Sequence, residues 1–495
     1  MGKYDIAIIG SGLGGLECGA ILSKEGYKVC VLEKNPLYGG CFQSFKRKGH
    51  LLDTGMHYIG SMEKGQLMYQ ILTYLGIYDK IKLRKLDNTA FDIINYKGKE
   101  YKYATGHKAF IESLSNDFPE QRANLTKYVN FLEKIGKLVS VELLKEGKLS
   151  EGALDLMSTS AYETIKEMIG DEDLQQIIAG TSLLYGGDKE RTTFYHHAMV
   201  TNSYLEGSYR FVDGSMQVAD ALVAQIRANG GDVFNNKEVT SIKMEGDLVS
   251  CLEVNNEELF YADNFISDVH PSITLDILEK NKVIKKAFKT RINSLVNTYS
   301  VFTTYLIMKP KKCKYRNSNI YLHRDKDLWY DESKTGTYSC MLSFQANSKN
   351  KEFVDVISIL VPMQMSEVEE YSDTKCNNRG AGYEAFKEKK SQEVISFVNK
   401  YHPEIVENIE SVFTTSPLSY RDYTATLNGT AYGIIKDHKA IYKSLLSPRT
   451  KINNLFLTGQ NLNVHGAMGV SVTALYTCAE FLGEEYLAKK VGGVL

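Results

Sequence analysis

An apolar run, a glycine-rich turn, a helical segment and a second apolar run open the chain in that order, and together they predict an α/β fold. Residues 6–9 form a short continuous apolar run, typical of a central parallel strand that is buried on both faces. A helix is expected over residues 13–24 and a second strand over residues 29–32. This order begins a Rossmann-like, doubly wound sheet.

The spacing of the glycines in the turn predicts a dinucleotide site. In the pattern G-x-G-x-x-G, the glycines allow a tight turn, a close approach to pyrophosphate and close packing of the helix on its strand. The helix amino terminus carries about half a positive charge, which favours phosphate. Glu33 lies where a carboxylate can accept hydrogen bonds from the adenosine ribose and repel a 2′-phosphate, which leaves FAD or NAD. The candidate contacts are Gly10, Gly12, Leu13, Gly14, Gly15, Glu33 and Lys34.

Length and composition limit the class of protein. A chain of 495 residues suggests two domains, and 43% hydrophobic with 24% charged residues is typical of globular proteins. The net charge of -1 gives no pull toward nucleic acid. The eight cysteines form no CxxC pair and no zinc-ligand spacing, so we expect reduced thiols and no metal.

The sequence indicates a cytoplasmic protein. Its first ten residues form a strand pattern instead of a signal peptide, and no stretch approaches the ~20 apolar residues that span a bilayer. The basic segment "KPKKCKYR", residues 309–316, is interpreted either as a solvated loop or as a contact with anionic lipid. Peripheral contact with a membrane surface therefore stays open.

Four blocks of sequence resemble a known family. They are "NPLYGGCFQSF" with "HLLDTGMHYIG", "SYRFVDGSMQVADALVAQIRANGGDVFNNKEVTSI", "ADNFISDVHP" and "NNLFLTGQNLNVHGAMGVSVTALYTCAEFLG". In these blocks the chain resembles the retinol saturase branch of the carotenoid desaturase and isomerase family (phytoene desaturase-like), whose members are FAD-dependent oxidoreductases. The resemblance implies that the dinucleotide is FAD.

The resemblance also implies further FAD contacts. Two of them depart from the common desaturase pattern, since Cys41 stands where Arg is usual and Gln460 where an acid is usual. A helix from about residue 470 to 482 would aim its positive end at flavin N1 and the C2 carbonyl, where negative charge gathers on reduction. The implied contacts are Gly39, Gly40, Cys41, Met56, His57, Val239, Gly459, Gln460, His465, Met468, Gly469 and Val470.

Three residues are candidates for catalysis, each with a structural alternative. His57 could orient the flavin or donate a proton, or could be a structurally satisfied histidine. Tyr423 and Tyr432 could line an aromatic tunnel or supply a proton, or could pack in the core. The adjacent His196 and His197 point apart on a helix or strand, so a shared metal is not expected.

The dispersed blocks predict a discontinuous FAD-binding domain. Its expected segments are 1–78, 206–285 and 445–495, and segments 79–205 and 286–444 would form the substrate domain. Helical periodicity over 108–145, interrupted by Pro119, and strand patterns over 298–308 and 354–362 predict a mixed sheet covered by helices. No other glycine group has the strand–turn–helix setting of a second nucleotide fold. An electron donor would be NAD(P)H entering the flavin pocket or a separate protein.

We therefore expect a FAD-dependent oxidoreductase that acts on carbon–carbon double bonds of an apolar polyene. Retinol saturase-like reduction is the first interpretation, and carotenoid desaturation or isomerisation is the second. An amine oxidase-like flavoenzyme shares the fold, although the position of Cys478 inside the last long helix argues against the covalent flavin common in that class. A non-catalytic FAD-binding protein is the remaining alternative.

Overall fold

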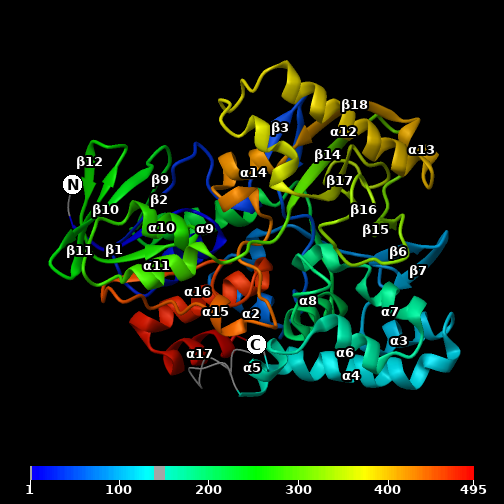
Figure 1. Ribbon diagram of the computed structural model, residues 1–495, viewed down its shortest axis with the longest axis horizontal. Helices are drawn as coiled ribbons and strands as arrows, with labels where there is room; N and C mark the ends of the chain where they lie inside the picture. The colour runs from blue at the N-terminus through cyan, green and yellow to red at the C-terminus, as the bar shows by residue number, and fades with distance from the viewer. Residues whose placement is uncertain (1–2, 139–150, 495) are drawn as a thin grey trace.

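The apolar run at the amino terminus forms the centre of a parallel sheet. The computed structural model describes residues 3–138 and 151–494. The central strand pairs in parallel with one strand close to it in sequence and one far from it. The five strands, in spatial order, are β19 (Leu455–Leu457), β13 (Ala262–Ser267), β1 (Tyr4–Ile9), β2 (Val29–Leu32) and β9 (Asp232–Phe234). Distant parts of the chain therefore meet in one layer, on the left of Figure 1.

Alternate residues of this sheet enter two different cores, which explains its uninterrupted apolar strands. Ile6 and Ile8 pack with helices, whereas Ala7 and Ile9 pack with an antiparallel meander. The helices are α1 (Leu13–Lys24), α9 (Met216–Ala228), α16 (Gly466–Leu482), α2 (Leu67–Tyr74) and α17 (Glu484–Gly492). The meander consists of β10 (Val239–Glu245), β11 (Leu248–Val254) and β12 (Glu258–Phe260). Helix α1 has the predicted bounds, and α16 begins four residues before the predicted start.

A second, mixed sheet lies on the right of Figure 1, as the sequence predicts. Its strands, in spatial order, are β18 (Ile409–Thr415), β14 (Ser300–Met308), β17 (Val356–Met363), β16 (Ser339–Phe344), β15 (Asn319–His323), β6 (Asp92–Tyr96) and β7 (Lys99–Tyr103). Only the pairing of β15 with β6 is parallel among these described strands. Two antiparallel pairs complete the strands: the hairpin of β3 (Ser44–Arg47) with β4 (His50–Asp53), and the long-range pair of β5 (Leu83–Lys85) with β8 (Tyr209–Phe211).

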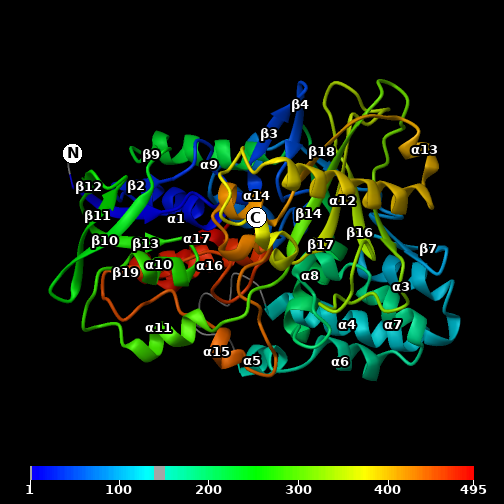
Figure 2. The ribbon, with the colours of Figure 1, turned by 45° about the horizontal axis from the view of Figure 1, so that its top comes forward.

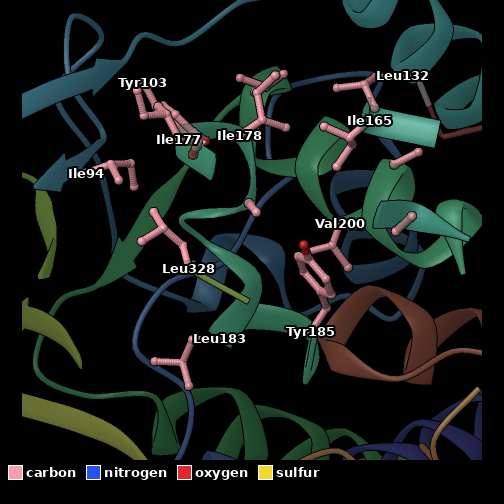
Figure 3. Packing of buried hydrophobic residues seen from close by; sticks show 14 of the residues in the cluster. Ile94, Tyr103, Leu132, Ile165, Ile177, Ile178, Leu183, Tyr185, Val200 and Leu328 are labelled. Carbon is pink, nitrogen blue, oxygen red and sulfur yellow. Dashed lines mark hydrogen bonds between the residues drawn. The ribbon is translucent and has the colours of Figure 1, made fainter. Parts of the chain in front are cut away.

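Helices cover both faces of the mixed sheet, and Figures 1 and 2 agree on their placement. One face packs on α12 (Ala381–Asn399), next to α13 (Pro403–Val406). The other face packs on α3 (His107–Ser115), α4 (Arg122–Leu138), α5 (Glu151–Met157), α6 (Ala161–Met168), α7 (Glu172–Ala179) and α8 (Phe194–Glu206). Figure 3 shows this second core, where Ile94 of β6 lies with Leu132 of α4 and Ile177 of α7.

The predicted helical region 108–145 contains two helices, α3 and α4, with a 3₁₀ turn at Pro119 between them. Residues 139–145 of that prediction lie outside the described residues. Four short helices complete the fold: α10 (Pro271–Ile277), α11 (Lys286–Asn293), α14 (Pro417–Thr424) and α15 (Ile441–Ser444). None of the helices in the described ranges combines the length and apolarity needed to cross a bilayer. The predicted bounds of the two domains stay a prediction.

Candidate cofactor and active site

A cavity of about 450 Å³ opens at the carboxyl ends of the parallel strands. It is lined by the turn after β1, the end of β2, the residues after β13 and the start of α16. Beside β1, the strand order changes direction, with β2 on one side and β13 on the other. In open α/β sheets, ligands bind at such a topological switch point. The cavity therefore lies where the fold places a dinucleotide.

The glycine turn is shaped for close backbone approach. Gly10 has φ of +93°, which L side chains rarely adopt. A Cβ on Gly15 would collide with the backbone oxygen of Gly10, so α1 packs on its own strand only if Gly15 has no side chain. Gly12 is the N-cap of α1 and makes no side-chain cap, and the first turn of the helix holds no acidic residue. Its amino terminus thus faces the cavity as an anion-binding end.

Glu33 is buried at the end of β2 and lines the cavity. Its Oε2 accepts hydrogen bonds from Ser11 N at 3.2 Å and Ser11 Oγ at 2.5 Å, and its Oε1 accepts one from Asn35 N at 2.8 Å. These donors fix the carboxylate beside the glycine turn. The position is that of the predicted ribose acceptor.

The start of α16 closes another side of the cavity. His465 is the N-cap residue, and Gly466, Ala467 and Val470 line the cavity. Gly469 faces away and packs against Val464, where a Cβ would lie 2.8 Å from that residue. The long helix therefore directs its positive end toward the cavity, with no acidic residue in its first turn.

The two histidines predicted near the flavin are buried and neutral at neutral pH. Burial lowers the pKa of His465 to about 4, although the Tyr185 backbone oxygen, 2.7 Å from Nε2, opposes this shift. Burial, with a smaller effect of Arg210, also lowers the pKa of His57 to about 4. Nε2 of His57 and Nδ1 of His465 are buried without a hydrogen-bond partner. Neither ring belongs to the cavity lining.

His196 and His197 are held by separate partners. His196 Nδ1 lies 2.7 Å from Thr193 Oγ1, and its ring stacks on His465 with centroids 5.1 Å apart. His197 lies between the hydroxyls of Tyr128 and Tyr185, at 2.6 and 2.8 Å. Across the described residues, no group of three or more His, Cys, Asp or Glu is arranged to hold a metal ion.

The two predicted catalytic tyrosines differ in burial. Tyr432 is half-buried, and its hydroxyl donates to the Leu183 backbone oxygen at 2.8 Å. Tyr423 is 39% exposed, and its hydroxyl donates to Asn377 Oδ1 at 2.8 Å. Both side chains belong to residues that line the cavity. Tyr432 is therefore the less exposed of the two.

The cavity lining contains fourteen of the predicted site residues: Gly10, Gly12, Leu13, Gly14, Glu33, Lys34, Gly40, Cys41, Met56, Val239, Tyr423, Tyr432, Gln460 and Val470. Seven predicted residues lie outside it: Gly15, Gly39, His57, Gly459, His465, Met468 and Gly469. The assignment of both sets to the cofactor or to catalysis stays a prediction.

Sequence reasoning missed the residues that follow β13, above all Asp268, and the aromatic residue Tyr420. Asp268 could have been found, because the switch-point rule points to the carboxyl end of the strand beside β1. Tyr420 carried no such signal. Its hydroxyl donates to the Thr54 backbone oxygen at 2.8 Å, a contact between segments far apart in sequence.

Part of the cavity wall is apolar and aromatic. Val301 of β14 and Leu360 of β17 come from the mixed sheet, and Leu427 and Ala431 come from the segment after α14. The cavity therefore extends from the glycine turn to a water-poor wall of the second sheet. A turn open to pyrophosphate, a ribose acceptor and a helix end beyond them suit FAD. The fold and the site define a FAD-dependent oxidoreductase.

Comparison with known proteins agrees with this class. The chain belongs to the flavin containing amine oxidoreductase family, whose model matches residues 13–344. It is 27% identical to the all-trans-retinol 13,14-reductase of Rattus norvegicus, over 97% of this chain and 86% of that protein. It is 25% identical to prolycopene isomerase 1 of an Oncidium hybrid cultivar, over 58% of this chain. A crystal structure of an oxidoreductase from Methanosarcina mazei shares the fold, with a TM-score of 0.63 and 15% identity over 95% of this chain and 98% of that one.

Proposed function

We propose that this flavoenzyme reduces a carbon–carbon double bond of an apolar, conjugated small molecule, with retinol-like polyenes as the substrate class. The observation that carries the proposal is the apolar and aromatic wall of the cavity, formed by Val301, Leu360, Tyr420 and Tyr432. The similarity to all-trans-retinol 13,14-reductase over nearly the whole chain supports the same reaction.

The chemistry of a polyene explains why such a wall is suitable. A polyene without a carbonyl offers no group for the protein to polarise, so charge must be spread by conjugation in a site that excludes water. When bound and reduced by an electron donor, FAD would supply the hydride for such a reduction. The wall residues position the chain of double bonds, and the amino terminus of α16 favours negative charge in the cavity.

We assign the proton-donating role to Tyr432 among the three predicted catalytic residues. It is half-buried and lines the cavity, whereas Tyr423 is 39% exposed and His57 lies outside the lining. Burial raises the pKa of Tyr432 well above its usual value, so its phenol keeps its proton until a strongly basic carbon takes it. The hydrogen bond to Leu183 holds the ring in place.

The test is an anaerobic incubation of the photoreduced protein with all-trans-retinol. We expect the flavin to reoxidise and the product to gain two hydrogens by mass spectrometry. Oxidised protein, handled in the same way, is the control and should leave retinol unchanged. A reducible flavin that neither retinol nor a C40 polyene reoxidises would contradict the proposal.

The similarity to prolycopene isomerase favours a second candidate, isomerisation or desaturation of a carotenoid. With a C40 polyene, an unchanged mass and altered retention would indicate isomerisation. A loss of two hydrogens with oxidised protein would indicate desaturation. Because the family is described as one of amine oxidoreductases, a primary amine is a further candidate substrate to test with the oxidised protein. Flavin reduction by the amine would favour that activity.

The electron donor and the place of action remain proposals. We infer that NAD(P)H or a protein reductant delivers electrons to the same cavity. The basic segment 309–316 is the candidate for membrane-surface contact, and two of its charges have partners in this chain: Lys309 Nζ donates to the Glu407 backbone oxygen at 2.9 Å, and Arg316 pairs with Glu404 at 2.9 Å. These contacts support the interpretation as a solvated loop.

A further inference from the structure

Asp268 follows β13 at the switch point and lines the cavity. Its carboxyl is packed between the glycine turn and the turn after β19. A Cβ on Gly12 would lie 2.5 Å from Asp268 Oδ2, and one on Gly14 would lie 2.7 Å from Oδ1. A Cβ on Gly459 would also collide with Oδ1. The glycines thus form a cradle that a carboxyl group fills.

The backbone N–H groups of Gly15 and Gly12 act on this carboxyl as hydrogen-bond donors. They belong to the first turn of α1, where N–H groups have no partner within the helix. In this fold, those groups face the pyrophosphate of the dinucleotide. Asp268 therefore places a carboxyl at an end of the helix that the cofactor also needs.

Two other carboxyls lie close enough to Asp268 to act on its charge. Glu33, after β2, and Glu17, inside α1, both interact with it. Glu17 is fully buried, with its Oε1 accepting from Ser471 Oγ of α16 at 2.8 Å. On its own segment, His270 is kept neutral because burial lowers its pKa to about 4. The charged residues elsewhere in the lining are Lys34, Lys237, Glu238 and Arg421.

Burial raises the pKa of Asp268 to about 7, and the charge of Glu33 contributes to this rise. The N–H groups of Gly15 and Gly12 lower this pKa, but burial outweighs them. Burial likewise raises the pKa of Glu17 to about 8. Pyrophosphate brings further negative charge into this cluster. Like charges in a buried site are relieved when one group binds a proton. Asp268 lines the cavity, and Glu17 does not.

We propose that Asp268 takes up one proton from solvent when FAD binds, so that cofactor loading is coupled to pH. The uncharged carboxyl then faces the pyrophosphate without repulsion and can donate a hydrogen bond in place of accepting one. Where the free carboxyl is ionised, one proton leaves the buffer for each FAD bound, and no electron moves. The inference rests on the FAD assignment alone, so it stands or falls separately from the polyene reaction.

The test measures FAD affinity of the full-length apoprotein by quenching of flavin fluorescence, between about pH 6 and about pH 8. A carboxyl that ionises near pH 7 when free and stays protonated in the complex makes the Kd about tenfold weaker at about pH 8 than at about pH 6. We expect Asp268→Asn to remove most of this dependence, because it has no proton to gain. The matched control is Asp263→Asn, the same change at an exposed position of the same strand, which should keep the tenfold ratio.

Calorimetry provides a readout that needs no variant. Titrating FAD into wild-type apoprotein in two buffers with different ionisation enthalpies should report net uptake close to one proton at about pH 8. Burial lowers the pKa of Lys436 to about 7, so this residue can also gain a proton when FAD binds. Because Lys436 is unchanged in Asp268→Asn, its contribution is the same in both proteins. If proton uptake on FAD binding is lower by about one in Asp268→Asn than in wild type, the proton is taken up by Asp268. A flat Kd and no uptake in wild type, or an unchanged slope and unchanged uptake in Asp268→Asn, would overturn the proposal.

Discussion

Two parts of one cavity are built in opposite ways, and the difference separates what binds the cofactor from what selects the substrate. The glycine turn between β1 and α1 is a continuous stretch of chain whose shape follows from its own residues. The apolar wall is assembled from β14, β17 and the segment after α14, which meet only through long-range packing. A local motif therefore accounts for the binding of a dinucleotide, whereas the proposed selection of the substrate depends on the tertiary fold.

The largest expected effect comes from a substitution in the glycine turn. In Gly12→Val, the new side chain would push against the Asp268 carboxyl and fill the approach to the helix end. We expect FAD affinity to fall by at least about 10³-fold, which is about 4 kcal/mol. The measurement is flavin content and Kd of the purified protein. Gly382→Val, in α12, is the control, since a Cβ there would meet only the Tyr371 side chain, at an ordinary contact distance of 3.6 Å. Full flavin occupancy in a folded Gly12→Val protein would refute this view of the turn.

The next effect tests the packing that holds the mixed sheet. Trp329 is 2% exposed within the core that joins this sheet to the helices α3–α8, and its ring lies edge-on to Tyr162. Trp329→Ala leaves a large cavity, which should lower the free energy of unfolding by about 3 to 5 kcal/mol. Urea unfolding measures this loss. We expect FAD affinity of the folded variant to change little, because Trp329 lies outside the cavity lining. A parallel loss of FAD affinity would show that the two parts are not independent.

The same contrast explains what the sequence could predict. The bounds of α1 and β2 follow from apolar runs and the glycine turn, and the structure has both where they were expected. For α16 the sequence predicts too late a start, because Gly466 and Gly469 suggest a turn. The helix begins at Gly466, and Gly469 allows it to pack closely on Val464. Asp268 escaped notice because its position beside the glycine turn depends on the pairing of β13 with β1.

A smaller expected effect distinguishes a catalytic role of Tyr432 in the apolar wall from a role in cofactor binding. Tyr432→Phe removes the hydroxyl and keeps the ring, whose centroid lies 5.2 Å from that of the His465 ring. We expect the rate of polyene reduction to fall about 10²-fold, the lower range for loss of a general acid, with FAD affinity unchanged. Stopped-flow reoxidation of the flavin measures this rate. Tyr423→Phe is the matched control and should lower the rate less than threefold. Equal rates for wild type and Tyr432→Phe would remove Tyr432 as the proton donor.

The smallest expected effect concerns an exposed charge pair at the edge of the mixed sheet, in contrast to the half-buried Asp268. Lys97 Nζ and Asp173 Oδ1 are 2.6 Å apart, with side chains 44% and 41% exposed. Water and salt weaken such a pair, so Lys97→Met should cost no more than about 1 kcal/mol in unfolding free energy. The hydrogen bond from Lys97 lowers the pKa of Asp173, so this stabilisation is present above the ordinary Asp pKa and is lost as the pH falls through the lowered value. Urea unfolding at neutral and acidic pH should therefore show the difference only near neutrality, and added salt should reduce it. A loss of several kcal/mol in unfolding free energy that added salt does not change would mean that solvent does not weaken this pair, and would contradict the prediction.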